Sequence, residues 1–120
     1  MDNFTQLQAW KVGLEIVKEI YALTKKFPRS EMYALTSQVQ KSSTSVLANI
    51  AEGYGRYTFP DKAGKYIIAR GECTETEAHV RIAVALGFIT EKDAQSIINN
   101  IYTERRLLSG LIAACRKHDK

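Results

Sequence analysis

The sequence has few of the residues that shape β-rich or disulfide-stapled proteins. Only two of its 120 residues are proline and seven are glycine, too few turn formers for a sandwich or barrel of many short strands. Two cysteines, Cys73 and Cys115, are too few for a disulfide framework. We expect both to be buried thiols in a reducing compartment, within a helical protein.

Long apolar runs and a leader segment are missing as well. The longest uncharged apolar stretch, residues 82–89, is far shorter than the ~20 residues that cross a bilayer. The first residues lack the basic start and apolar block of a signal peptide. We therefore expect a cytoplasmic protein with no membrane partner, and a single domain over residues 1–120.

The first predicted helix begins at a capping box of Thr5 and Gln8 and is ended by Pro28. Apolar residues recur in it at spacings of three and four, along two neighbouring seams. The seams are Leu7, Trp10, Leu14, Val17 and Tyr21, and Gly13, Ile16, Ile20, Leu23 and Phe27. Such a wide apolar face, with more apolar surface than one small bundle buries, predicts association with further copies of the chain.

The second predicted helix starts at a Thr36 or Ser37 cap and stops at Gly53, for which we expect a left-handed conformation. Its middle, residues 42–45, consists of serine and threonine. These residues have weak helix propensity, so the segment needs tertiary packing to stay helical. Their small side chains also permit a close approach of a neighbouring helix.

The third predicted helix begins at a box led by Thr58 and ends at Gly87, and the fourth begins at a Thr90 and Asp93 capping box. The basic tail at 116–120 is expected to fray. Four helices joined by short turns predict an all-α, up-down-up-down four-helix bundle. The core seam expected for the third helix is Ala63, Ile67, Gly71, Thr74, Ala78, Ile82 and Ala85.

Positive charge exceeds negative charge by four, with 17 Lys and Arg against 13 Asp and Glu, which is compatible with a polyanion partner. Lysines spaced seven apart align on the first helix over roughly 21 Å. A solvated face is the simpler alternative, because Glu15 and Glu19 lie within one turn of this row. The candidate nucleic-acid contacts are Lys11, Lys18, Lys25, Lys26 and Arg29, and, after the second helix, Arg56, Lys62 and Lys65, with Arg70 as an additional candidate.

Patterns for metal binding or catalysis are weak. Cys73 and His79 are six apart, so they face different sides of a helix, and no Glu-x-x-His pair occurs. We expect no metal and no cofactor. Glu75 and His79 share a helix face and could serve a nuclease as an acid and base pair. An ion pair is the simpler interpretation, because no nucleophile is recognisable.

Several blocks of the sequence resemble a known family. The blocks are Phe4-x-x-Leu7-x-x-Trp10, Phe27-Pro28-x-x-Glu31-x-Tyr33-x-Leu35-Thr36-Ser37-Gln38, Ser45-Val46-x-x-Asn49-Ile50-Ala51-Glu52-Gly53-x-Gly55-Arg56, and Ala69-x-Gly71-x-x-x-Glu75. Together they resemble the bacterial four-helix-bundle proteins found as reading frames within intervening sequences of large-subunit ribosomal RNA genes. The accessory variability protein of diversity-generating retroelements is a relative. Glu72 departs from the family pattern, which more often has serine there.

The resemblance implies a four-helix protomer, a homopentamer with a basic surface and no known enzymatic activity. It also implies binding to RNA or DNA, or assistance to a nucleic-acid enzyme such as a reverse transcriptase. We interpret Asn49, Glu52, Gly53, Gly71 and Glu75 as structural residues, since polar groups at helix ends usually satisfy backbone groups. Our leading hypothesis is a non-catalytic, homo-oligomeric nucleic-acid-binding bundle. A protein scaffold is the alternative, and a nuclease is a remote one.

Overall fold

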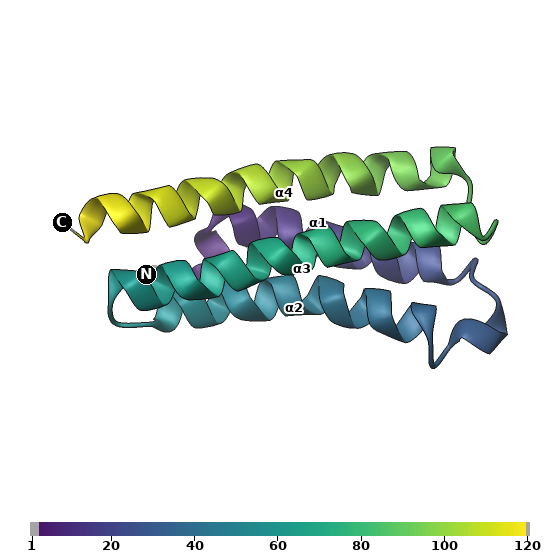
Figure 1. Cartoon of the computed structure of the whole chain (residues 1–120), viewed down its shortest axis with the longest axis horizontal. Helices are drawn as coiled ribbons and strands as arrows, with labels where there is room; N and C mark the ends of the chain where they lie inside the picture. The colour runs from purple at the N-terminus through teal and green to yellow at the C-terminus, as the bar shows by residue number, and fades with distance from the viewer. Residues whose placement is uncertain (1–2, 120) are drawn as a thin grey trace.

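The protein is a bundle of four long helices, shown by a computed structural model that describes residues 3–119 (Figure 1). The bundle measures 49 × 24 × 23 Å, and consecutive helices run in opposite directions. This confirms the predicted all-α, up-down-up-down architecture. The elements are the short 3-10 turns η1 (Phe4–Gln6) and η2 (Arg29–Glu31) and the helices α1 (Gln8–Thr24), α2 (Leu35–Gly55), α3 (Phe59–Ala85) and α4 (Glu91–His118).

Each helix packs against two others, in the cyclic order α1, α2, α3, α4. Helices α1 and α3 therefore lie diagonally across the bundle, and their outer faces point in opposite directions. The centre is filled by side chains without measurable exposure, among them Ile50 and Ile101. No helix in residues 3–119 combines the length and the apolar composition needed to span a membrane.

The two seams predicted on the first helix are buried to different degrees, and of the Leu7 to Tyr21 seam only Leu7 and Trp10 pack against the core. Gly13, Ile16 and Ile20 are buried, whereas Leu14 and Tyr21 of the other seam remain 36% and 45% exposed. The α1 helix therefore carries an apolar strip, Leu14 and Tyr21, that the rest of residues 3–119 leaves exposed.

Both ends of α1 differ from the prediction. The Thr5 and Gln8 capping box is absent, because Asn3 Oδ1 accepts the Thr5 amide at 2.8 Å and caps η1 instead. The helix ends at Thr24, before Pro28 is reached, because the amides of residues 25–27 bond to carbonyls only three residues back. A tightened turn of this kind commonly closes a helix.

The α2 helix also differs from the prediction, at its start and at Gly53. The helix begins at Leu35, whose amide donates to Glu31 Oε1 at 3.3 Å, so neither Thr36 nor Ser37 is the cap. Gly53 is helical and buried, and a Cβ there would lie 2.7 Å from Tyr66 Cε1. It is a packing glycine, and the left-handed glycine of the described chain is Gly87, with φ +78°.

The α3 helix turns a different face to the core than we predicted. Its buried residues are Ala63, Tyr66, Ala69, Cys73, Thr76, Val80 and Ala83. From Ala63 onward the expected seam diverges from this one, and Ile67 and Ile82 are 38% and 45% exposed. The helix is apolar on more than one side, so periodicity alone could not choose the inner face. The exposed residues Gly64, Ile67, Ile68, Gly71, Ala78 and Ile82 form what we call the outer stripe of α3.

The serine-rich middle of α2 packs as predicted. Ser42 and Ser43 are buried, and Ser42 Oγ lies 2.8 Å from Thr76 Oγ1 of α3. Each serine hydroxyl also donates to a backbone carbonyl of α2. The small hydroxyl side chains thus allow α2 and α3 to approach closely while their polar atoms stay paired.

Helix starts with a local cap were predicted correctly. Thr58 caps α3, and the Thr90 and Asp93 capping box of α4 is complete. The basic tail was not, because α4 continues through Arg116 to His118. The His118 ring stacks on Phe59 at 5.4 Å, and basic residues in a last turn favour the helix C-terminus. Lys120 of the predicted tail lies outside the described residues.

Candidate functional site

The predicted lysine row, Lys11, Lys18 and Lys25, is exposed on the outer side of α1. Lys18 Nζ lies 3.4 Å from Glu15 Oε1, and both side chains are more than half exposed. Such a pair contributes little in solvent. The three lysines therefore share the exposed side of a single helix, as predicted.

Glu19, which we expected to neutralise this row, is used elsewhere. Its carboxylate accepts from Ser96 Oγ and from Asn100 Nδ2, both at 2.6 Å, and so ties α1 to α4. Lys26 donates to Asp93 at 2.8 Å, which lowers the pKa of Asp93 to about 2, with help from the Thr90 amide. Lys26 thereby ties the end of α1 to the start of α4.

The second predicted cluster surrounds the turn from α2 to α3. Glu52 accepts from Lys65 at 2.8 Å and lies 3.9 Å from Arg56. The hydrogen bond and charge of Lys65, and then the charge of Arg56, hold the pKa of Glu52 below its ordinary value. Lys62 Nζ donates to the Tyr54 carbonyl at 2.6 Å and lies over the Tyr54 ring. The geometry of the cluster supports a structural role in closing the turn.

The residues interpreted as structural behave in different ways. Asn49 Nδ2 donates to the Ser45 carbonyl at 2.9 Å, within α2. A Cβ on Gly71 would meet nothing within 4 Å, because Gly71 is exposed on the outer stripe of α3. Packing within the protomer therefore gives no reason for a glycine at this position.

Glu75 and His79 form the predicted pair, with Oε2 and Nε2 3.4 Å apart. His79 Nδ1 is buried without a hydrogen-bond partner among the described residues. Burial, and then the nearby charge of Glu75, raise the pKa of Glu72. Within residues 3–119, no group of three or more His, Cys, Asp or Glu side chains could hold a metal ion.

An arginine-rich surface between α3 and α4 is the feature that sequence reasoning missed. Its residues line a hollow of about 600 Å³ that we call the arginine hollow: Arg70, Tyr102, Arg105, Arg106 and Ser109. Arg70 Nη1 donates to Ser109 Oγ at 3.3 Å, and the Arg105 guanidinium lies 4.9 Å from the Tyr102 ring centre. Of these five residues, the sequence predicts only Arg70 as a nucleic-acid contact.

Glu77 binds Arg105 of this hollow and also Arg81, which lies one turn further along α3. Its carboxylate accepts from Arg105 Nη1 at 2.6 Å and from Arg81 Nε at 2.8 Å. Burial acts against ionisation of Glu77, but these bonds outweigh it and lower the pKa of the carboxyl. One ionised carboxylate therefore fixes two arginines, while Arg70 and Arg106 have no ion-pair partner within residues 3–119.

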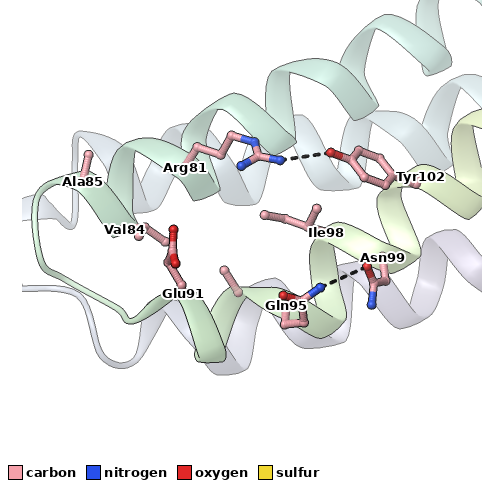
Figure 2. Close-up of a pocket in the computed structure, with 9 residues that line it drawn as sticks. Arg81, Val84, Ala85, Glu91, Gln95, Ile98, Asn99 and Tyr102 are labelled. Carbon is pink, nitrogen blue, oxygen red and sulfur yellow. Dashed lines mark hydrogen bonds between the residues drawn. The ribbon is translucent and has the colours of Figure 1, made fainter.

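A second cavity, of about 490 Å³, shares Tyr102 with the hollow. Figure 2 shows this second cavity and the residues that line it. We call it the amide pocket after Gln95 and Asn99, which lie one turn apart on α4. Arg81 and Tyr102 approach each other across its other side, with Arg81 Nη2 donating to Tyr102 Oη at 3.0 Å. The pocket is lined by Arg81, Val84, Ala85, Glu91, Ala94, Gln95, Ile98, Asn99 and Tyr102.

The bundle interior also holds a buried carboxyl group, which the sequence patterns did not predict. Glu104 of α4 has no exposed surface, and neither carboxylate oxygen has a hydrogen-bond partner among the described residues. Burial raises the pKa of Glu104 to about 8, so the carboxyl is mostly protonated at neutral pH. Its position on the α4 seam, between Ile101 and Leu108, was the available signal.

Known proteins resemble this chain in both sequence and structure. The family model described as "23S rRNA-intervening sequence protein" matches residues 5–110. A crystal structure from Bacteroides thetaiotaomicron VPI-5482, titled as a protein with unknown function from the S23 ribosomal protein family, is 28% identical with a TM-score of 0.79. The match covers 87% of this chain and 97% of that one. The comparison with curated proteins gave no match.

The bundle fold and the family match over most of this chain's length lead to one assignment: the chain belongs to the 23S rRNA-intervening sequence protein family.

Proposed function

We propose that the protein is a non-catalytic, self-associating bundle that binds the phosphate backbone of RNA or DNA. The observation that carries the proposal is the arginine hollow, a surface lined by Arg70 of α3 and by Arg105 and Arg106 of α4. Within residues 3–119, Arg105 is the only one of the three that is paired with a carboxylate, that of Glu77. Guanidinium groups are suited to phosphate because their planar donors match its oxygens.

The arginines keep donors available for a ligand. Arg70 uses Nη1 on Ser109, and Arg105 uses Nη1 on Glu77. Since a guanidinium group carries five N–H donors, each side chain retains several. Glu77 and Tyr102 hold Arg105 in place, which reduces the entropy lost when phosphate binds. The hollow is therefore better prepared for phosphate than the row of separate lysines on α1.

Self-association would multiply this charge. The uncovered strip of α1, with Leu14 and Tyr21, and the outer stripe of α3 lie on opposite sides of the bundle. Two different apolar faces favour a heterologous contact, in which α1 of one copy packs on α3 of the next. Five such copies, the number that the family resemblance implies, would carry a formal charge of +20, from +4 on each chain. Nucleic acid would then meet several arginine hollows at once.

A titration of labelled single-stranded RNA and of duplex DNA at several salt concentrations tests this function. Phosphate contacts release counterions, so the affinity should fall steeply as salt rises. Absence of binding at low salt would contradict the proposal and favour the alternative of a protein scaffold. The exposed apolar faces of α1 and α3 are also compatible with a scaffold.

A further inference from the structure

The amide pocket continues directly from the arginine hollow, and the two share Tyr102. Its volume of about 490 Å³ falls within the range of small-ligand sites. Val84, Ala94 and Ile98 contribute apolar surface, while polar side chains line the rest. A surface suited to phosphate thus leads into a pocket suited to a group that is both apolar and hydrogen-bonding.

Gln95 and Asn99 present a donor and an acceptor side by side in this pocket (Figure 2). Gln95 Nε2 donates to Asn99 Oδ1 at 3.3 Å. This bond orients both amides and leaves the Gln95 oxygen to accept and the Asn99 nitrogen to donate. Asparagine and glutamine use the same pair of functions to bind adenine. The amides therefore match the edge of a nucleobase.

Arg81 supplies a flat surface on the other side of the pocket. Its Nε is held by Glu77 at 2.8 Å and its Nη2 by Tyr102 at 3.0 Å. Because two nitrogens are held, the plane of the guanidinium group is fixed. Guanidinium planes and aromatic rings are the surfaces on which unstacked bases lie in single-strand recognition.

The amide pocket and the arginine hollow together form one groove, and its two ends differ in charge. Glu91 is the first residue of α4 and lines the amide pocket, whereas Arg105 and Arg106 lie four turns further along the helix, in the arginine hollow. A carboxylate repels phosphate but accepts hydrogen bonds from the amino group of cytosine. Phosphates are therefore expected at the arginine end of the groove and a base at the Glu91 end.

We propose that this groove binds single-stranded nucleic acid, with one unstacked base in the amide pocket and the adjoining phosphates in the arginine hollow. The inference rests on the proposed function and adds that the ligand is a single strand with an accessible base. A duplex offers the same phosphates, but its base edges are paired and its bases stacked. The pocket should therefore distinguish the two forms.

The test compares two labelled 12-nucleotide DNA strands, one of ordinary deoxyadenosine and one that is abasic throughout, at equal salt. The full-length wild type should bind the deoxyadenosine strand about tenfold more tightly, the effect expected from about one stacked base. The pocket variant Gln95→Ala/Asn99→Ala should lose most of this ratio. Both side chains are exposed, so the bundle should still fold. Gln8→Ala/Gln38→Ala, which removes two exposed amides on α1 and α2, is the matched control and should keep the ratio.

Equal affinity of the wild type for both strands, or an unchanged ratio in the pocket variant, would overturn the base site. The proposed function would survive either result if affinity still fell with salt. Failure of the wild type to bind either strand at low salt would overturn both. A strand carrying 2-aminopurine gives a second measurement, since its fluorescence should change on binding to the wild type and less on binding to the pocket variant.

Discussion

Gly13 of α1 and Glu104 of α4 share one space in the bundle core. A Cβ on Gly13 would lie 2.6 Å from Glu104 Oε2 and 2.8 Å from Leu47 Cδ2. Glu104 and Leu47 are themselves buried, so neither side chain can turn outward to make room. The glycine allows a carboxyl group to enter the interior, and the size of one residue sets the position of the other.

Replacing Gly13 with alanine should therefore destabilise the wild type in a way that depends on Glu104. Overpacking a core costs about 1 to 3 kcal/mol, whereas glycine to alanine in a helix gains about 1 kcal/mol. In a Glu104→Ala background the clash with the carboxylate is gone and only the contact with Leu47 Cδ2 remains, so the same substitution should cost clearly less. Urea unfolding of the four members of this double-mutant cycle should show a coupling free energy of at least about 1 kcal/mol. Strict additivity would mean that the two side chains do not compete for space.

The carboxyl of Glu104 should make stability depend on pH. Its pKa is about 8 in the folded protein and 4.5 ordinarily. Between these values the folded chain keeps a proton that the unfolded chain has released, so the free energy of unfolding should fall as pH rises from about 4.5 to 8. The expected slope is about 1.4 kcal/mol per pH unit.

The Glu104→Gln variant isolates this effect, because glutamine has nearly the same shape and does not titrate. Urea unfolding at intervals from pH 5 to pH 9 should show that wild-type stability falls relative to the variant up to about pH 8 and then levels off. Parallel pH profiles for the two proteins would show that Glu104 keeps an ordinary pKa.

Truncation of the core should be costly at positions that are fully buried. Ile50→Ala and Ile101→Ala each remove a side chain with no exposed surface, and each should lower the free energy of unfolding by about 2 to 5 kcal/mol. Tyr57→Ala is the control, because that side chain is 97% exposed and its loss should cost less than about 0.5 kcal/mol. Similar values for all three variants in urea unfolding would contradict the assigned core.

Self-association should depend on the outer stripe of α3. Light scattering of the wild type at micromolar concentration should give several times the protomer mass of 13.5 kDa. Replacing two exposed isoleucines in Ile67→Ser/Ile82→Ser should shift the mass toward the monomer while the helical content is kept, because these side chains leave the core intact. A stable wild-type monomer of 13.5 kDa would contradict self-association.

The caps at Thr58 and Thr90 could be predicted because each depends on residues within one turn of chain. The inner face of α3 could not, because Tyr66 and Ile67 are adjacent and both apolar, and the choice between them depends on contact with Gly53 of α2. The same limit applies at the start of α2, where the partner of the first amide is a Glu31 side chain outside the helix.

The candidate site was partly accessible from sequence. The lysine row follows from spacing on one helix, and its exposure is confirmed, but its function stays a prediction. The arginine hollow joins Arg70 to Arg105 and Arg106, about 35 residues further along the chain, so it depends on the register between α3 and α4. No residue pattern within either helix alone specifies that register. Equally, Glu52 lies beside Lys65 only because the turn brings the two helices together.

The salt dependence of single-stranded RNA binding by two variants is the most direct test of where phosphate binds. Arg70→Gln/Arg106→Gln removes two arginines of the hollow, and Lys11→Ala/Lys18→Ala/Lys25→Ala removes the lysine row on α1. In a plot of log affinity against log salt, each lost phosphate contact should flatten the slope by about 0.7. We predict that the two-arginine variant flattens the slope by about 1.4, more than the three-lysine variant does. Because Lys11, Lys18 and Lys25 lie within one turn of Leu14 or Tyr21 on α1, the slopes are compared at equal oligomer mass, checked by light scattering. An unchanged slope in the arginine variant together with a flatter one in the lysine variant would contradict the account and place the phosphate site on α1.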